Sequence, residues 1–322
     1  MPHPDHAPGL TAVRMGAGPG QEAEARRTRS RDAAPAIALG PILCPCDFSA
    51  ASPDALRLAV PLARAYGAEI VALHVIPTNL PASGGFRSLP NPALLRPHLR
   101  DDVSRALDGV LQPARAAAVV TRSALREGKP ADEILKVAAA LPAGLIVMGT
   151  HGRGAIDRAV LGSVAETVLR KATCPVLAVP PAFPAPAGAA WPRTVLWATD
   201  FSPDADLGLR YALSVAEKAR ADLIVVHVLE GEGRHRAAGA HRAEERLRGA
   251  VALEGGAERD AEAVVAAGSP AGEILGLARA RGVELIVLGA SGMGALERML
   301  FGSTVLGVVR EAACPVLVVR RR

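Results

Sequence analysis

One pattern of glycines is written twice in this chain, and that repetition limits the fold more than any other feature of the sequence. The stretch GTHGRGAIDRAVLGS begins at Gly149, and GASGMGALERMLFGS begins at Gly289, which is 289 − 149 = 140 residues later. The two stretches agree at every glycine and at the closing Gly-Ser, although most residues between them differ. A repeat of this length indicates a duplicated domain and not a solenoid of short units.

The match between the two halves extends well beyond the glycines. Residues 128–179 correspond to residues 268–319 at the same offset of 140, whereas ILCPCDFS and VLWATDFS upstream differ by 200 − 47 = 153. The first half therefore carries an insertion of 153 − 140 = 13 residues, which lies in residues 77–100, where prolines and glycines predict irregular chain. We expect four parts, which are a disordered N-terminal tail at 1–38, a first domain at 39–180, a Pro/Ala linker at 181–192 and a second domain at 193–322.

The composition excludes two broad classes of function. Half of the 322 residues are apolar, which suffices for two cores, and 5 Phe, 2 Trp and 2 Tyr offer almost no surface for base stacking. The formal net charge of +5 is not gathered into a long stripe, so nucleic-acid binding is not expected. No long uncharged apolar run is present and none follows Arg26-Arg27, so we expect neither a membrane span nor an export signal, but a cytoplasmic protein. Met15 is an alternative start to Met1.

The four cysteines are predicted to be buried thiols. Cys174 and Cys314 each open CPVL at equivalent places in the two halves, and Cys44 and Cys46 stand two apart in an apolar run. Two such residues would share one face of a strand, as a metal site requires. Because no second Cys or His pair stands at ligand spacing, small buried side chains are favoured over metal ligands, and nothing requires an oxidising compartment.

Short apolar strands alternate with helices in each half. In the second half the pattern predicts strands at 193–200, 222–229, 261–268, 283–289 and 314–320, with helices at 202–221, 241–253, 270–282 and 303–313. Ser202 is expected at the N-cap of the first helix and Pro203 at its first position. Nearly continuous apolar strands indicate a parallel sheet covered on both faces. The expected fold class is α/β, with two repeated doubly wound domains of five strands each.

The repeated glycines stand where such sheets bind ligands, at the carboxyl ends of the strands. The predicted strand LIVMG runs directly into Gly149, and Gly162-Ser163 open the next helix. Glycine lets backbone amides approach an anion closely, and the start of a helix adds unpaired donors and a favourable dipole. The pattern therefore predicts a phosphate cradle in each half.

Two structural explanations compete with a ligand for the same residues. Gly149 ends a strand, and Ser163 with Glu166 has the spacing of a capping box, in which the serine caps the helix. In the second half the box position is Leu306, yet Gly302-Ser303 remain, which favours the ligand. Other phosphate motifs are excluded, because the chain has no G-x-x-x-x-G-K-[ST] and because GRGAID lacks the last glycine of a dinucleotide fingerprint.

The combined pattern resembles the universal stress protein family. The spacing G-x2-G-x9-G-[ST] from Gly149 to Ser163 is similar to that family's nucleotide-binding signature, and CDFS, LHVI and CPVL with their second copies TDFS, VHVL and CPVL resemble its other segments. The resemblance covers about residues 40–320 in two copies. It implies a tandem protein with five-stranded parallel sheets in the order 3-2-1-4-5 and a pocket for ATP or AMP, with Mg²⁺, in each half.

The resemblance also implies which residues bind the nucleotide. In the first half these are Pro45, Cys46, Asp47, Val75, Met148, Gly149, Gly152, Gly162, Ser163 and Val164. In the second half these are Ala198, Thr199, Asp200, Val228, Leu288, Gly289, Gly292, Gly302, Ser303 and Thr304. The aspartates would lie at the nucleoside end and the later glycines around the phosphates, an order that keeps like charges apart. Cys46 departs from a threonine frequent in the family, and Ala198 replaces Pro45 of the first half, so both bear on the base contacts.

We expect a regulatory ATP-binding protein with little or no turnover, whose nucleotide occupancy changes assembly or partner binding. The alternatives are a stress-linked interaction scaffold that binds no nucleotide, and a slow ATPase. His151 is the candidate base of an ATPase, although Ser291 replaces it in the second half, and Arg153, opposite Met293, is a candidate phosphate contact. The resemblance further implies that CPVLAVP and CPVLVVR pair the two halves within one chain, and a homodimer is an additional expectation.

Overall fold

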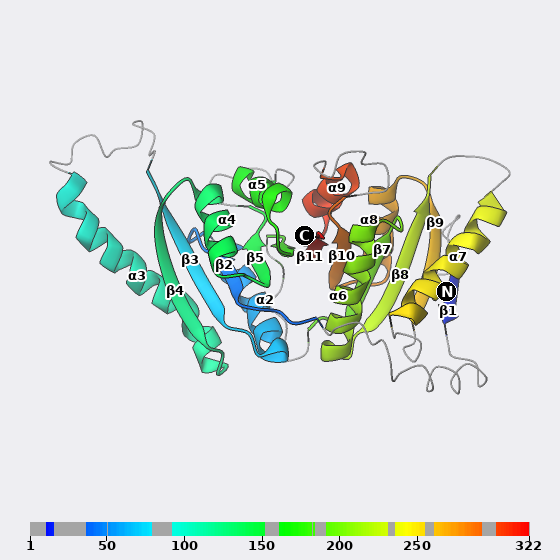
Figure 1. Ribbon diagram of the computed structural model, residues 1–322, viewed down its shortest axis with the longest axis horizontal. Helices are drawn as coiled ribbons and strands as arrows, with labels where there is room; N and C mark the ends of the chain where they lie inside the picture. The colour runs from blue at the N-terminus through cyan, green and yellow to red at the C-terminus, as the bar shows by residue number, and fades with distance from the viewer. Residues whose placement is uncertain are drawn as a thin grey trace, which may run out of the picture. The chain divides into compact units, whose positions relative to one another are not determined.

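The computed structural model divides into two compact units, which we call the first domain (Ala38–Ala189) and the second domain (Ala190–Arg321, together with Met1–Ile37) (Figure 1). The structure describes residues 11–15, 37–49, 51–78, 92–151, 161–181, 183, 191–230, 236–254, 261–291 and 301–321.

The first domain alternates strands and helices along the chain. Its elements are β2 (Ile42–Pro45), α2 (Ala51–Tyr66), β3 (Ile70–Pro77), α3 (Pro92–Ala116), β4 (Thr121–Gly128), α4 (Pro130–Ala140), β5 (Leu145–Gly149), α5 (Ser163–Lys171) and β6 (Val176–Val179). The sheet order is β6-β5-β2-β3-β4, and every neighbouring pair is parallel. Counted within the domain this is 3-2-1-4-5, so the predicted order is confirmed.

The second domain repeats the same plan. Its elements are β7 (Thr194–Thr199), α6 (Pro203–Ala219), β8 (Asp222–Leu229), α7 (Arg236–Leu253), β9 (Ala261–Ala267), α8 (Pro270–Ala280), β10 (Leu285–Gly289), α9 (Ser303–Glu311) and β11 (Val316–Val319). Its parallel order β9-β8-β7-β10-β11 is again 3-2-1-4-5. Ser202 caps α6 as predicted, because its Oγ accepts a hydrogen bond of 3.3 Å from the amide of Ala205.

Helices cover both faces of each sheet, which explains the unbroken apolar strands. In the first domain α2 and α3 pack together against one face and α4 and α5 against the other (Figure 1). The residues Leu145–Met148 of β5 and Leu285–Leu288 of β10 are all buried. Strands that are covered by helices on both faces need no polar residue at alternate positions. Their sequence is therefore continuously apolar and does not alternate between polar and apolar residues.

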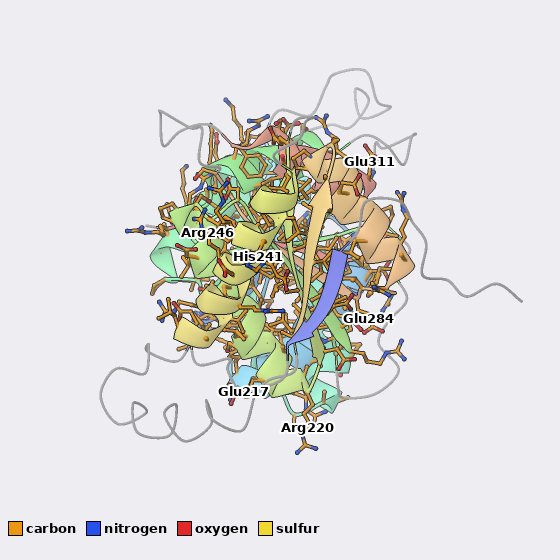
Figure 2. The ribbon with its side chains drawn as sticks, turned by 90° about the vertical axis from the view of Figure 1, so that its right-hand side faces the viewer. Glu217, Arg220, His241, Arg246, Glu284 and Glu311 are labelled. Atoms are coloured by element: carbon orange, nitrogen blue, oxygen red, sulfur yellow. The ribbon has the colours of Figure 1, made fainter. Side chains whose placement is uncertain are left out.

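Two stretches differ from the expectation. Residues 77–100 were expected to be irregular, but α3 begins at Pro92, so their last part is helical. Proline fits the first position of a helix because it has no amide to leave unpaired there. Within the expected disordered tail, β1 (Thr11–Met15) pairs antiparallel with β9, and Figure 2 shows the two strands side by side. The rest of the tail up to residue 36 lies outside the described residues.

Among the helices that the structure describes, none has the length and apolar character needed to cross a membrane.

Candidate functional site

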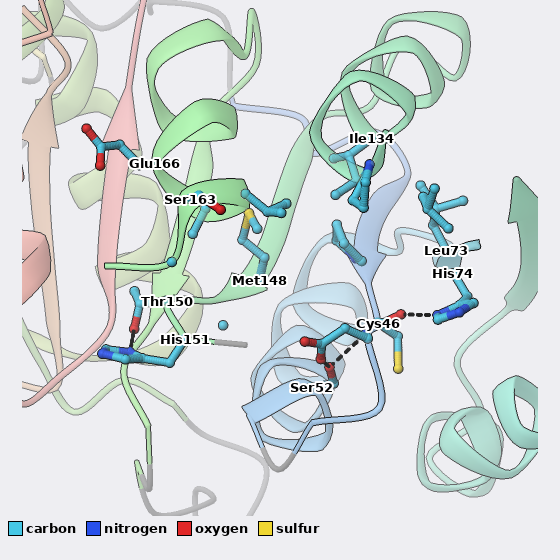
Figure 3. A pocket seen from close by; sticks show the side chains of 18 of the residues that line it. Cys46, Ser52, Leu73, His74, Ile134, Met148, Thr150, His151, Ser163 and Glu166 are labelled. Atoms are coloured by element: carbon cyan, nitrogen blue, oxygen red, sulfur yellow. Dashed lines mark hydrogen bonds between the residues drawn. The ribbon is translucent and has the colours of Figure 1, made fainter. Parts of the chain in front are cut away.

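A cavity of about 700 Å³ opens at the carboxyl ends of β2, β3 and β5 in the first domain. Ligands of doubly wound sheets bind at this end, where the strand order reverses. In Figure 3 Ser163 and Met148 lie on one side of the cavity, and Cys46 and His74 lie on the other. The cavity is lined by Pro45, Cys46, Asp47, Ser52, Leu73, His74, Val75, Pro77, Pro130, Ile134, Met148, Gly149, Thr150, His151, Leu161, Gly162, Ser163, Val164, Ala165 and Glu166.

The start of α5 turns unpaired backbone donors toward this cavity. Gly162 is the N-cap residue and offers no side chain to cap the helix. The first intrahelical bond is the one from the Glu166 amide to the Gly162 carbonyl, at 2.9 Å. The amides of Ser163, Val164 and Ala165 precede that bond and therefore have no partner inside the helix. All three residues line the cavity, so the N-terminus of α5 has the chemistry of an anion site.

The capping-box explanation of Ser163 is wrong. A capping box needs the serine at the N-cap, but Ser163 is the first residue inside α5 and its side chain is exposed. Glu166 binds Arg170 instead of reaching back, with Oε1 accepting bonds of 3.0 Å from Nε and 2.9 Å from Nη2. Helix capping therefore does not account for the repeated serine.

The repeated glycines have two different structural explanations. A Cβ on Gly149 would lie 2.9 Å from the Cβ of Ala51, and a Cβ on Gly289 would lie 2.5 Å from the Ala205 amide nitrogen. Close packing of the first helix against the strand thus requires both of these glycines. Gly302 is different, because its φ of −61° suits any residue and its Cβ would approach no atom closer than 3.7 Å. Gly162 has the same backbone, with φ −62° and ψ 139°. The conformation of the chain does not explain glycine at these two helix starts.

Asp47 is held firmly at the end of β2. Its Oδ1 accepts hydrogen bonds from the Ser52 hydroxyl (2.7 Å) and from the Ser49 amide (2.9 Å), while its own amide donates to Ser52 Oγ (3.1 Å). These contacts fix the carboxylate at the cavity wall, in the short segment between β2 and α2.

His74 braces the same strand end. Its Nδ1 lies 2.7 Å from the carbonyl oxygen of Cys46, and a carbonyl only accepts, so Nδ1 carries the proton. The ring of Phe48 packs against the imidazole with centroids 4.7 Å apart. The second domain repeats both contacts, at 2.8 Å between His227 Nδ1 and the Thr199 carbonyl oxygen and 4.6 Å between Phe201 and His227.

Thr150 and His151, which directly follow β5, also line the cavity. The Thr150 amide donates to the Val179 carbonyl oxygen at 2.9 Å, and its hydroxyl donates to the same oxygen at 3.2 Å. His151 Nδ1 lies 2.8 Å from the Thr150 hydroxyl oxygen, so the imidazole is held beside the cavity by a side chain of its own loop.

The residues predicted for the second half occupy corresponding elements. Ala198, Thr199 and Leu288 are buried at the strand ends, and Thr199 Oγ1 accepts a bond of 2.8 Å from the Phe201 amide. Asp200 Oδ1 accepts a bond of 3.0 Å from the Ser202 amide. Val228 lies in β8, Gly289 ends β10, Gly302 is the N-cap of α9, and Ser303 and Thr304 are its first two residues.

All predicted first-half residues that the structure describes line the one cavity, while Gly152, its counterpart Gly292, Arg153 and Met293 lie outside the described residues. Of the other lining residues, the sequence pointed only to His151, as the candidate base of an ATPase. Pro130 and Ile134 come from α4, which follows the edge strand, and only the folded arrangement brings them there. Thr150 and His151 stand inside the quoted glycine motif, so their position beside Gly149 was a usable signal.

No metal site emerges from the residues that the structure describes, because no three His, Cys, Asp or Glu side chains gather closely enough to hold an ion. The four cysteines are buried free thiols. The prediction that Cys44 and Cys46 are buried side chains is confirmed.

Comparison with known proteins gives the same family for both domains. The model of the universal stress protein family matches residues 39–180 and again residues 192–320. A universal stress protein of Mycolicibacterium smegmatis is 28% identical over 87% of this chain and 97% of its own length, and universal stress protein MJ0531 of Methanocaldococcus jannaschii is 37% identical over 43% and 80%. The crystal structure of a universal stress protein from Archaeoglobus fulgidus is similar, with a TM-score of 0.67 at 26% identity, over 89% of this chain and 98% of that one. The chain belongs to the universal stress protein family.

Proposed function

We propose that the first domain binds an adenine nucleotide, ATP or AMP, with its phosphates at the start of α5. The observation that carries this proposal is the N-cap Gly162, which has an ordinary backbone conformation and no capping side chain, beside a 700 Å³ cavity. A cavity of this volume is in the range that holds a small-molecule ligand. The unpaired amides of Ser163 and Val164, with the Ser163 hydroxyl, would donate to phosphate oxygens.

The opposite wall of the cavity suits a nucleoside. Asp47 is held by Ser49 and Ser52 and presents an acceptor that fits the hydroxyls or the amino group of a nucleoside. Val75 and Met148 offer apolar surface to the base. The carboxylate lies at the end of β2 and the phosphate donors at the start of α5, so the two negative groups would be kept apart. Mg²⁺ would arrive with the phosphates, whose oxygens are its preferred ligands.

The second domain carries the same cradle at Gly302, Ser303 and Thr304, and we propose a second nucleotide site there. We further propose that occupancy of these sites regulates assembly or partner binding in the cytoplasm, as part of the stress response for which the family is named. Pairing of the two halves within one chain, or of two chains in a homodimer, would be the step that occupancy controls.

We propose little or no turnover. Hydrolysis needs a base and a water held in line with the terminal phosphate. His151 is the residue nearest to that role, but its Nδ1 is engaged with Thr150 and the second domain has Ser291 in its place. A site that binds and holds nucleotide is the function that these contacts support best.

Titration of the full-length protein with Mg-ATP by calorimetry tests the proposal. Saturable binding is expected, and Gly162→Val should weaken the first-domain site about a hundredfold, because the new side chain fills the space of the phosphate. Gly276→Val is the matched control, since a Cβ at this exposed position of α8 meets no atom within 4 Å. Wild-type protein without saturable binding would favour an interaction scaffold. Steady turnover that is lost in His151→Ala would favour a slow ATPase.

A further inference from the structure

We propose that Asp204 makes the second domain's site weaker for ATP than the first domain's site, so that the chain has one tight and one weak triphosphate site. This inference rests on the nucleotide binding proposed above. It concerns a difference between two sites that share the same glycine cradle. It identifies Asp204 as the residue that sets their ranking.

Asp204 is a buried carboxylate at the second position of α6, with 7% of its surface exposed. Its Oδ2 accepts hydrogen bonds from the amide (3.2 Å) and the hydroxyl (2.5 Å) of Ser291, and its Oδ1 accepts one of 3.0 Å from the amide of Arg321. One side chain thus ties together the start of α6, the loop after β10 and the chain after β11. Its carboxylate accepts three hydrogen bonds from the last two of these segments.

The first domain lacks this arrangement at all three positions. The counterparts, from the offsets of 153 and 140, are Ala51 for Asp204, His151 for Ser291 and Pro181 for Arg321. Alanine has no carboxylate, and proline has no amide to donate. We call the hydrogen-bonded set of Asp204, Ser291 and Arg321 the clamp. The clamp belongs to the second domain only, because all three residues are different in the first domain.

The clamp lies beside the second domain's cradle. Ser291 directly follows Ala290, whose carbonyl oxygen accepts a bond of 3.1 Å from the amide of Gly302, the N-cap of α9. The Ser291 carbonyl oxygen in turn accepts a bond of 3.0 Å from the Ser202 hydroxyl. In the first domain the counterpart of Ser291 is His151, which lines the cavity. Asp204 thus holds a residue whose counterpart faces the proposed nucleotide.

Two physical effects of Asp204 disfavour a triphosphate. The carboxylate occupies the amide and hydroxyl of Ser291, which would otherwise be donors at the end of β10. Its negative charge also forms no ion pair with any residue in the described part of the chain, and because it is buried, solvent screens it poorly. Both effects grow with the charge of the ligand, so adenosine should be affected much less than ATP.

Calorimetric titration of the full-length protein with Mg-ATP tests the inference. Wild type should show one tight and one weaker site, and Asp204→Asn, which keeps the shape and removes the charge, should tighten the weaker site about tenfold while the tight site stays unchanged. The control is Asp206→Asn, an exposed aspartate in the same turn of α6 that changes the net charge equally. This control should change neither affinity by more than about twofold, since water screens its charge. Adenosine binding should be the same in all three proteins.

Two glycine variants assign the sites, because Gly302→Val should remove the weaker one and Gly162→Val the tight one. Two equal sites in wild type, an unchanged weaker site in Asp204→Asn, or an equal gain in Asp206→Asn would overturn the inference while nucleotide binding stands. A wild type that binds no ATP would overturn the proposed function itself. If Asp204→Asn unfolds the second domain, the variant with Asp204→Ala, Ser291→His and Arg321→Pro copies the first domain, and it should bind two equivalents of ATP tightly.

Discussion

The two domains share the same contacts around the site, which we call the frame, but they differ in a core residue beneath these contacts. Both have a histidine bonded to the carbonyl that ends the first strand, both stack a phenylalanine on that histidine, and both start the last helix with an uncapped glycine. Beneath this frame the first domain has Cys44 where the second has Trp197. The contacts at the mouth of the site are thus retained while the packing below is free to change, as expected if the mouth has a task other than stability.

The largest expected effect on stability comes from replacing Trp197, a large core side chain that the second domain has and the first domain lacks. The side chain is fully buried, and its Nε1 donates a bond of 2.9 Å to the carbonyl oxygen of Ala205. Trp197→Ala should lower the free energy of unfolding of the second domain by about 3–5 kcal/mol, whereas Cys44→Ala should cost the first domain about 1 kcal/mol.

Tryptophan fluorescence during urea unfolding separates the two domains, because both Trp191 and Trp197 belong to the second one. Trp191 keeps the signal in the Trp197→Ala variant, and far-UV circular dichroism follows both domains together. Equal losses from Trp197→Ala and Cys44→Ala would mean that the two cores are filled equivalently after all.

The next effect separates the two kinds of repeated glycine. Gly289→Ala should destabilise the second domain by about 1–3 kcal/mol, because its Cβ would collide with the backbone of Asp204 and Ala205. Gly302→Ala should leave stability within about 0.5 kcal/mol of wild type, since its backbone and surroundings accept a Cβ. Urea unfolding measures both. A large loss in Gly302→Ala would show that this glycine serves the fold, and would remove one support for the cradle.

Much of the fold follows from the sequence because the strands carry a strong signal. The predicted strand 222–229 coincides with β8, and the other predicted strands of the second domain differ only at their ends. Helix starts with Ser or Pro were equally clear, as at α6 and α8. The start of α3 was missed because prolines dominate residues 77–100, and helix α7 begins at Arg236, five residues before its predicted start. In both cases the local sequence signal for a helix start is weak, so the sequence pattern alone does not mark where the helix begins.

The candidate site was predictable only in part. The glycines and Ser163 were found because they are repeated, but the sequence could not separate Gly289, which packing explains, from Gly302, which packing does not. Asp204 was not singled out at all. Its role depends on Ser291 and Arg321, which are 87 and 117 residues away along the chain. Only the folded backbone brings such partners together.

A smaller effect concerns the alkaline limit of stability, where one buried thiol of each domain should act in the same way. Burial raises the pKa of Cys314 to about 12, and burial, with a smaller contribution from Cys46, also raises the pKa of Cys44. The unfolded thiol loses its proton near pH 8.5 while the folded thiol keeps it, so stability is lost as pH rises above that value. Between pH 8.5 and 9.5 we expect a loss of about 1 kcal/mol from each of these two thiols.

Urea unfolding of wild type and Cys314→Val at the two pH values measures this loss for the second domain, and Cys44→Val does so for the first. Each variant should lose about 1 kcal/mol less than wild type over that interval. A variant with the same pH dependence as wild type would show that its thiol ionises equally in the folded and unfolded chains.

The smallest expected effect lies at the outer strands, where the two sheets again differ. β4 of the first domain is largely accessible and carries Arg122 and Arg126, and charged residues of this kind protect a free edge from pairing. β9 of the second domain is mostly buried and apolar, and β1 pairs along it from Thr11 opposite Val265 to Met15 opposite Ala261 (Figure 2). An edge that is apolar except for Glu262 has little charge to protect it from pairing, so it needs such a cover. Removing residues 1–36 should therefore speed hydrogen exchange of the β9 amides about fivefold, the equivalent of one hydrogen bond of about 1 kcal/mol, and leave β4 unchanged. Mass spectrometry of proteolytic fragments resolves the two strands. Equal exchange at β9 with and without the N-terminal segment would mean that β1 adds no protection, and that the second domain, like the first, secures its own edge.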